Sequence, residues 1–433
     1  MITLISTRWN LSLLCGVIFT VVLFTAGESN AIPSFSRKYN TSCATCHIAF
    51  PRLTAFGEAF RRNGYQFPDG TDIENTKEDP VSLGSEGNKK AFPNALWPSA
   101  IPGTSPLSVI LELETTYTPK EEQKWNFNPF EGEFGLLAGG TLGEDISFWG
   151  EIDIAEDAVE IERAGIIFDN LFGGTTATAN LKIGKFEPGI YSFSNHRRLG
   201  PKYSITTITL GDNMWTMEAA QTGIELNGVI GEGRLGYNVG LVEGHGNLDN
   251  SDKDFYGHAT YKIGGMRLDG VVPEGFSMQN PTQPWEDNSV TIGGFIYKGT
   301  ASLTDEIKDE FKMFGGDVNI SYGRLNILGA YARHDDDNPF IDSPDVKGIM
   351  NSYLVEATYI VYPWLIPLLR FESSKVEGED LAQSSISPIV QVLVRANVRI
   401  ALEFNWASEP SENDPTSTTY SFEEFALGVN LGF

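Results

Sequence analysis

Segments of about ten residues with alternating apolar and polar side chains recur from residue 107 to the end of the chain. In the first of them, Leu111 and Leu113 alternate with Glu112 and Glu114. A two-residue period places one apolar and one polar face on a β-strand. The clearest further examples are Ile146 to Ile154, Ile161 to Phe168, Gly223 to Val229, Leu235 to Leu241, Phe255 to Ile263, Phe311 to Ile320, Leu325 to Tyr331, Tyr353 to Ile360, Ile389 to Val394 and Val398 to Trp406.

Tight polar turns such as Gly231–Gly233, Tyr322–Arg324 and Ala396–Asn397 alternate with longer polar loops between these segments. This arrangement is typical of a transmembrane β-barrel, and a large soluble sandwich or propeller is the alternative. Seventeen strand candidates can be counted, three of them between residues 253 and 299. Two strands in that stretch restore the alternation of short and long connections, which predicts sixteen strands, an even number, as bacterial barrels require.

The last nine residues, Phe425 to Phe433, place a bulky apolar residue at every second position and end on an aromatic ring. They resemble the closing strand of bacterial outer-membrane proteins. A soluble protein seldom leaves such a strand at the edge of a sheet, because an open edge invites pairing with other chains. We therefore predict an all-β fold: an antiparallel barrel of sixteen strands that contacts lipid in the bacterial outer membrane.

The first 31 residues read as a secretory signal peptide. Arg8 precedes an apolar run from residue 11 to 24, and Ser29 to Ala31 form a small-residue cleavage site. An uncleaved anchor is the alternative, but the apolar run is shorter than the roughly 20 residues that span a bilayer as a helix. Cleavage after Ala31 also removes Cys15, so only two cysteines remain.

The chain has 57 acidic and 31 basic residues and a formal net charge of −26. Phosphate backbones bind basic surfaces, so this balance argues against nucleic acid as a partner. Beyond the signal peptide we expect three regions: a haem-binding segment at 32–68, an extended linker at 69–106 that is rich in Pro, Gly and polar residues, and the barrel at 107–433.

The two remaining cysteines form the motif Cys43-Ala44-Thr45-Cys46-His47. In C-x-x-C-H the two thiols attach one haem c through thioether bonds and the histidine is the proximal iron ligand. A zinc site would need further Cys or His ligands, and residues 48 to 195 contain none. The motif in an exported chain therefore predicts one covalent haem.

The haem-binding segment is expected to contain one helix that starts at Pro51 and stops at Gly64, with Leu53, Phe56 and Phe60 on its apolar face. Arg61 and Arg62 lie on the other face, where they either face solvent or pair with haem propionates. So short a segment cannot bury a haem alone. We expect it to plug the lumen or mouth of the barrel, which is wide enough for a plug.

The sixth iron ligand is not supplied by the haem-binding segment, because no Met or second His lies between Ile48 and His196. His196 lies in the third outer loop, which folds into the lumen of sixteen-stranded porins, and it is followed by Arg197 and Arg198, two cations suited to propionates. His196 is our candidate distal ligand. The alternatives are a site without a strong distal ligand and other side chains, namely Met214, Met217, His245, His258, Met313 and His334.

Ala31 to Arg37, the C-x-x-C-H motif and the barrel that follows together resemble the fused monohaem cytochrome-porins of the outer membrane. The best-known members oxidise iron(II) and pass electrons to periplasmic cytochromes. Leu181 to Gly189 likewise looks like a segment of phosphate-selective porins. The resemblance implies an electron conduit from an extracellular reduced donor, such as Fe(II), to a periplasmic acceptor, such as a cytochrome.

Two other functions fit the same sequence. One is a solute porin in which the haem-bearing segment is a structural or gating plug and lumenal charges set the selectivity. The other is a soluble periplasmic cytochrome with a β-rich partner domain. Asp335 to Asp337, Glu377, Glu379 and Asp380 lie in outer loops, where they are either oxygen ligands for Fe(II) or ordinary charged loop residues.

Overall fold

The fold was analysed in a computed structural model of the chain. It describes residues 34–432 except 69, 80, 92, 94–99, 104, 128–133, 144, 155–157, 174–176, 218–219, 245–251, 272–285, 305, 344–345 and 412–416. The signal peptide, the terminal Phe433 and His245 therefore lie outside the described residues. No helix in the described part of the chain is long and apolar enough to cross a membrane.

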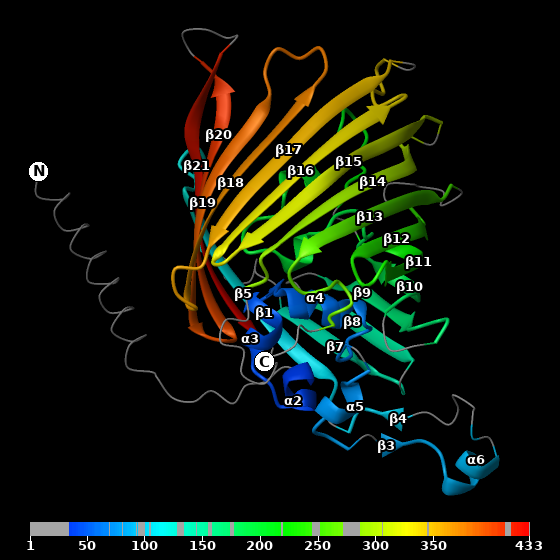
Figure 1. The fold of residues 1–433 in the computed structure, drawn as a ribbon. Helices are drawn as coiled ribbons and strands as arrows, with labels where there is room; N and C mark the ends of the chain where they lie inside the picture. Colours follow the sequence, from blue (N-terminus) through cyan, green and yellow to red (C-terminus); the bar gives the residue numbers. More distant parts are fainter. Residues whose placement is uncertain are drawn as a thin grey trace, which may run out of the picture. The chain divides into compact units, whose positions relative to one another are not determined.

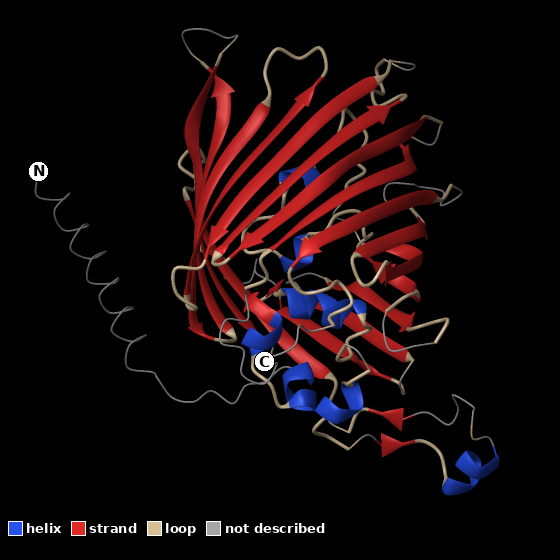
Figure 2. Ribbon diagram, in the orientation of Figure 1, coloured by secondary structure: helices blue, strands red, loops and turns tan. Residues whose placement is uncertain are grey.

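Sixteen strands of the described residues form a closed antiparallel barrel, with the two-residue strand β6 (Trp125–Asn126) paired on β5 (Figures 1 and 2). The predicted strand number is confirmed. In chain order the strands are β5 (Leu107–Tyr117), β7 (Phe134–Thr141), β8 (Ile146–Ile154), β9 (Val159–Phe168), β10 (Asn180–Phe186), β11 (Gln221–Ile230), β12 (Leu235–Val242), β13 (Asp254–Gly264), β14 (Ser289–Ser302), β15 (Lys308–Tyr322), β16 (Leu325–Asp336), β17 (Gly348–Tyr359), β18 (Leu365–Val376), β19 (Gln383–Arg395), β20 (Val398–Pro410) and β21 (Thr418–Gly432).

The last strand closes the ring on the first. β21 pairs antiparallel with β5 in a register that sets Leu427 opposite Thr115, so neither strand is left as an open edge. Two strands, β13 and β14, occupy the stretch where parity required two. One end of the barrel carries the tight turns after β11, β15 and β19, and the other carries longer loops; we call them the short-turn end and the long-loop end.

Along each strand, apolar side chains lie on the outer face of the barrel and more polar side chains lie on the inner face. On β14, Ile292 and Ile296 are 55% and 54% exposed, whereas the intervening inward side chains are covered. On β17 the inward positions include Ser352, Glu356 and Thr358. All three are buried, because other parts of the chain fill the lumen. An apolar outside and a polar inside are what a lipid-facing barrel requires.

The segment that carries the C-x-x-C-H motif folds as several short elements rather than one helix. They are α2 (Ser34–Tyr39), α3 (Cys43–Cys46), the hairpin of β1 (His47–Ala49) and β2 (Arg52–Leu53), and α4 (Ala55–Arg62). The predicted helix start at Pro51 is wrong, because Thr54 caps the helix: its side chain accepts from the Gly57 amide at 3.1 Å. Tyr39, Phe56, Phe60 and Phe67 form the core of this segment.

Residues 69–106 are not a fully extended linker. They contain α5 (Asp72–Asn75), α6 (Glu86–Ala91) and a pairing of β3 (Val81–Ser82) with β4 (Ala100–Ile101). The first part packs back on α2, because Asp72 accepts from the Tyr39 hydroxyl at 2.6 Å and forms an ion pair with Lys38 at 3.2 Å. Polar composition suggested a linker, but these specific partners fold it locally.

The long connection between β10 and β11, residues 187–220, folds into the lumen as the sequence predicts. It contains the 3-10 helix η1 (Asn195–Arg197) and α7 (Ser204–Thr207). Tyr203, Ile205 and Trp215 of this lumenal loop are buried against side chains of the strands, and Trp215 lies 4.7 Å from both Tyr297 and Phe311, ring centroid to centroid. Apolar burial thus holds the loop against the barrel wall.

Candidate functional site

A largely apolar cavity brings the predicted haem-attachment residues together with the barrel and the lumenal loop. Its empty volume, counted with the solvent at its mouth, is about 1550 Å³. Cys43, Cys46 and His47 line it, and so does His196. Asn397 and Gly432 place part of its wall at the short-turn end. Among its apolar lining residues are Phe35, Tyr39, Phe50, Leu53, Phe60, Phe67, Val109, Ile110, Leu137 and Trp149.

His47 is held with one ring nitrogen committed to the backbone. Its Nδ1 lies 3.2 Å from the carbonyl oxygen of Pro51, a hydrogen bond that makes Nδ1 the protonated nitrogen and leaves the lone pair on Nε2. Burial lowers the pKa of His47 to about 4. The imidazole is therefore neutral near pH 7 and has the form that binds a metal.

The two cysteines lie on the single turn α3. Ser42 caps this turn by accepting from the Ala44 amide at 3.2 Å. Burial raises the pKa of Cys43, and burial together with Cys43 raises that of Cys46 to about 12. Both side chains are thus thiols at neutral pH, which disfavours a reactive nucleophile.

α3 and α4 approach each other closely at Gly57. A Cβ on Gly57 would lie 2.1 Å from the Cys46 carbonyl oxygen, so only glycine fits there. The same carbonyl accepts from the Thr54 amide at 2.9 Å. The cap of α4 and the attachment motif are therefore one packed unit.

His196 enters the cavity from the lumenal loop. Ser194 accepts from the His196 amide at 3.1 Å and also donates to Glu187, which fixes the start of η1. The His196 Nε2 atom is buried and has no hydrogen-bond partner among the described residues. Burial and the nearby cations, led by Arg163 and Arg197, hold the pKa of His196 well below its ordinary value, so this imidazole is also neutral.

Three arginines line the cavity, namely Arg61, Arg163 and Arg197. Arg61 pairs with Glu58 of the same helix at 2.9 Å, and Arg197 of the loop lies 3.4 Å from the same carboxylate. Burial alone would raise the pKa of Glu58, but its arginine neighbours lower it to about 2. Glu58 is thus an anion near neutral pH that ties α4 to the lumenal loop.

The neighbouring arginines that we predicted to bind the propionates, Arg61 with Arg62 and Arg197 with Arg198, differ in the cavities that they line. Arg61 and Arg197 line the apolar cavity with the C-x-x-C-H motif, whereas Arg62 and Arg198 do not. Successive side chains on a helix point about 100° apart, which turns Arg62 away from its neighbour. Arg163 of β9 and Trp149 of β8 belong to the cavity and were missed by sequence reasoning.

The other candidate distal ligands lie away from this cavity. The His258 Nε2 atom lies 3.1 Å from Oδ1 of Asp317. Met313 of β15 and Met217 of the lumenal loop are both buried in the hydrophobic core between the loop and the strands. His334 is buried on β16, and Met214 is 69% exposed. Of the candidates within the described residues, His196 shares a cavity with His47.

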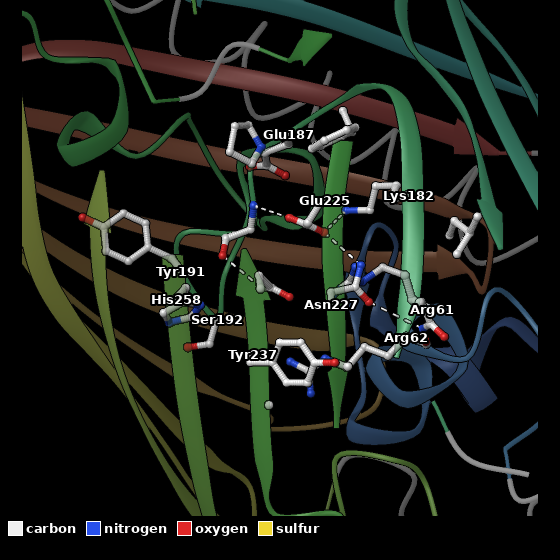
Figure 3. Close-up of a pocket in the computed structure, with 18 of the residues that line it drawn as sticks. Arg61, Arg62, Lys182, Glu187, Tyr191, Ser192, Glu225, Asn227, Tyr237 and His258 are labelled. Atoms are coloured by element: carbon white, nitrogen blue, oxygen red, sulfur yellow. Dashed lines mark hydrogen bonds and ion pairs between the residues drawn. The ribbon is translucent and has the colours of Figure 1, made fainter. Parts of the chain in front are cut away.

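A second, polar cavity lies between α4, the lumenal loop and strands β8–β13 (Figure 3). Arg61 and Arg62 reach it from α4, and Lys182 and Glu225 face it from neighbouring strands. Lys182 donates to Glu225 at 2.5 Å. The Arg62 carbonyl accepts from the Asn180 side chain at 2.8 Å, whereas its guanidinium makes no hydrogen bond or ion pair with the described residues. Arg62 also lines a third cavity toward the short-turn end.

The acidic loop residues form ion pairs with basic side chains rather than a metal site. Asp335 and Glu377 both bind Arg333, at 2.8 and 3.2 Å, and Asp337 binds Lys347 at 2.5 Å. Asp336 is buried against Asn213 at 3.4 Å. The described residues include no group of three or more His, Cys, Asp or Glu side chains placed to hold a metal ion.

Solved structures with a similar fold are outer-membrane channels. The anion-selective porin from Comamonas acidovorans has a TM-score of 0.55 at 12% identity, over 76% of this chain and 99% of that one. OmpF of Salmonella typhi in complex with daunomycin has 0.52 at 11%, over 77% and 98%, and the outer membrane channel DcaP of Acinetobacter baumannii has 0.51 at 10%, over 82% and 100%. The chain has a porin fold. No protein family and no curated protein matches it in sequence.

The porin fold agrees with the outer-membrane location that the sequence predicts. It also supports a lipid-contacting outer surface, as the exposed apolar band requires. At 10–12% identity the likeness extends to the fold alone. The chemistry of this chain depends on the residues that line its cavities rather than on the fold.

Proposed function

We propose that the protein is an outer-membrane electron conduit that carries one covalent haem c in the apolar cavity. The observation that carries the proposal is the set of donors around that cavity: two thiols and an imidazole from one motif, and a second imidazole, His196, from the lumenal loop. In this proposal Cys43 and Cys46 form the thioethers, His47 is the proximal ligand and His196 the distal one.

The residues present fit a haem in three respects. The lining is rich in aromatic and aliphatic side chains, as a macrocycle requires. The Nδ1 hydrogen bond of His47 leaves Nε2 for the iron. The Nε2 of His196 makes no hydrogen bond among the described residues, and the Glu162 carboxylate lies 3.9 Å from it. Arg61, Arg163 and Arg197 supply charge-assisted donors for the two propionates.

When bound, the haem supplies a one-electron redox centre. The chain's own residues would tune it: the Pro51 carbonyl orients His47, the aromatic walls limit solvent access, and the arginines favour the more negative state of the site. The proposed direction of electron flow is from an extracellular reduced donor, such as Fe(II), to a periplasmic acceptor, such as a soluble cytochrome.

The test is an anaerobic mixing experiment with the purified holoprotein. We expect Fe(II) to convert the oxidised haem spectrum to the reduced one, and the Cys43→Ala/Cys46→Ala double variant to show no covalent haem after denaturing electrophoresis. A parent chain without haem stain would reject the cofactor. A stained chain that no tested donor reduces would reject the conduit.

A solute porin with a haem-bearing plug is the second candidate, and the comparisons with known channels favour it because all three are porins or channels. The observation inside this chain that supports it is Arg62, whose guanidinium makes no hydrogen bond or ion pair among the described residues and which lines two lumenal cavities. Such a group attracts small anions. Planar-bilayer recordings test this function. A steady conductance whose ion selectivity shifts toward cations in Arg62→Gln would favour it.

A further inference from the structure

A fourth cavity lies at the long-loop end of the barrel, and we call it the outer cavity. Glu162, Lys185, Thr222 and Glu243 line it from the ends of β9 to β12 that meet the long loops. The lumenal loop completes it. Its empty volume, counted with open solvent, is about 1050 Å³, enough for a small chelate complex.

His196 lines both the outer cavity and the apolar cavity with the C-x-x-C-H motif. The apolar cavity in turn extends to Asn397, in the turn between β19 and β20 at the opposite end of the barrel. Two cavities that share one imidazole therefore lie toward opposite ends of the barrel: the outer cavity at the long-loop end, and the apolar cavity reaching the short-turn end. A molecule in the outer cavity would be separated from a haem by His196.

The outer cavity carries more cations than carboxylates. Lys185, Arg198 and Lys202 line it, against Glu162 and Glu243. Arg198 donates to the carbonyl of Asn195, and its Nε atom is buried with no hydrogen-bond partner among the described residues. The local charge thus favours an anion, in contrast to the acidic balance of the whole chain.

We propose that the outer cavity binds a small anionic electron donor, such as Fe(II) held by a carboxylate chelator, next to His196. This inference rests on the proposed conduit function and specifies its donor. One electron leaves the chelated Fe(II), which becomes chelated Fe(III), and passes to the haem iron; a one-electron periplasmic acceptor then removes it. No proton or covalent bond is exchanged.

The proposal explains how one haem can serve a barrel that crosses a membrane. The donor descends to His196 in the outer cavity, and the acceptor meets the apolar cavity at the short-turn end. It also replaces the acidic loops as the donor site, because Asp335, Asp337 and Glu377 already form ion pairs with Arg333 or Lys347.

The first test measures binding rather than electron transfer. Iron-free citrate is titrated calorimetrically into the holoprotein and into Lys202→Gln and Lys185→Gln. The matched control is Lys347→Gln, which removes one exposed cation at the same end of the barrel but outside the outer cavity. We expect affinity to fall about 3- to 10-fold in the first two variants and to stay unchanged in the control. Equal affinity in all four proteins would overturn the proposal.

The second test compares reductants by stopped flow. The rate constant with Fe(II) citrate should fall about tenfold as salt rises from low to high ionic strength, and Lys202→Gln should weaken that dependence. Uncomplexed Fe(II), a cation, should react more slowly and gain from salt. A faster reaction with uncomplexed Fe(II), untouched by Lys202→Gln, would overturn the proposal. Absence of covalent haem would instead reject the conduit function. The citrate titration would still show whether the outer cavity binds a small anion.

Discussion

Arg52 of β2 and Arg370 of β18 donate to the two oxygens of one carboxylate, that of Glu356 on β17. Arg52 lies 2.9 Å from Oε1, and Arg370 donates to Oε2 at 2.9 and 3.0 Å. Arg370 also donates to the Pro201 carbonyl at 2.7 Å and stacks on Tyr203, both in the lumenal loop. Glu356 therefore connects the elements that carry His47 and His196.

We expect Glu356→Gln to destabilise the folded protein by about 3–5 kcal/mol, because it removes the carboxylate that pairs with Arg52 and leaves the buried Arg370 only the more distant Glu372, 4.0 Å away. The measurement is the temperature at which heat-dependent gel mobility is lost. Glu377→Gln removes a carboxylate that is 52% exposed and should cost less than about 1 kcal/mol. Equal losses in the two variants would contradict the connecting role of Glu356.

Gly57→Ala should lower the yield of covalent haem, because its Cβ would clash with the Cys46 carbonyl and displace the attachment motif. Haem per chain is measured by absorbance against protein, in material whose heat-dependent mobility shows an intact barrel. Gly87→Ala is the matched control, since it is also helical and its nearest neighbour, the Ser85 Oγ atom, would be 3.5 Å away. Full haem content in Gly57→Ala would show that the close approach is not required.

Asp169, directly after β9, should make stability depend on pH. Burial raises its pKa from 3.8 to about 7 although Ser147 donates to it at 3.0 Å. The folded state thus binds the proton more tightly than the unfolded chain, so the stabilisation is full below about pH 4 and is lost as pH rises through about 7. Asp169→Asn should add about 2–4 kcal/mol at pH 8 relative to the parent and lose that advantage at pH 4. A constant difference across this range would refute the shift.

The barrel was predictable because its signal is local and repeated. β8 was expected from Ile146 to Ile154 and has those bounds, since the alternation of faces continues through it without interruption. Arg163 was missed because the register between β8 and β9 shifts beside Glu151, and a bulge changes which face the following side chains take. Alternation alone cannot locate such a shift.

The segment that carries the C-x-x-C-H motif was less predictable because its short elements depend on individual contacts. The start of α4 is set by the hydroxyl of Thr54, and the folding of residues 69–106 depends on Asp72 meeting Tyr39 and Lys38. His196 could be proposed because porins fold their third loop inward and because few other ligands exist in the chain. Its separation from His47 along the sequence hides the shared cavity from any motif search.

The central claim is a covalent haem c whose iron lies between His47 and His196. Its most direct test is the visible and electron paramagnetic resonance spectrum of the oxidised protein, recorded for the parent, His196→Ala and the control His258→Asn, which alters a histidine paired with Asp317 outside the cavity. We predict a low-spin parent and control, a high-spin His196→Ala protein, and return of the low-spin spectrum when imidazole is added. An unchanged low-spin spectrum in His196→Ala, or a parent that is already high-spin, would contradict the account.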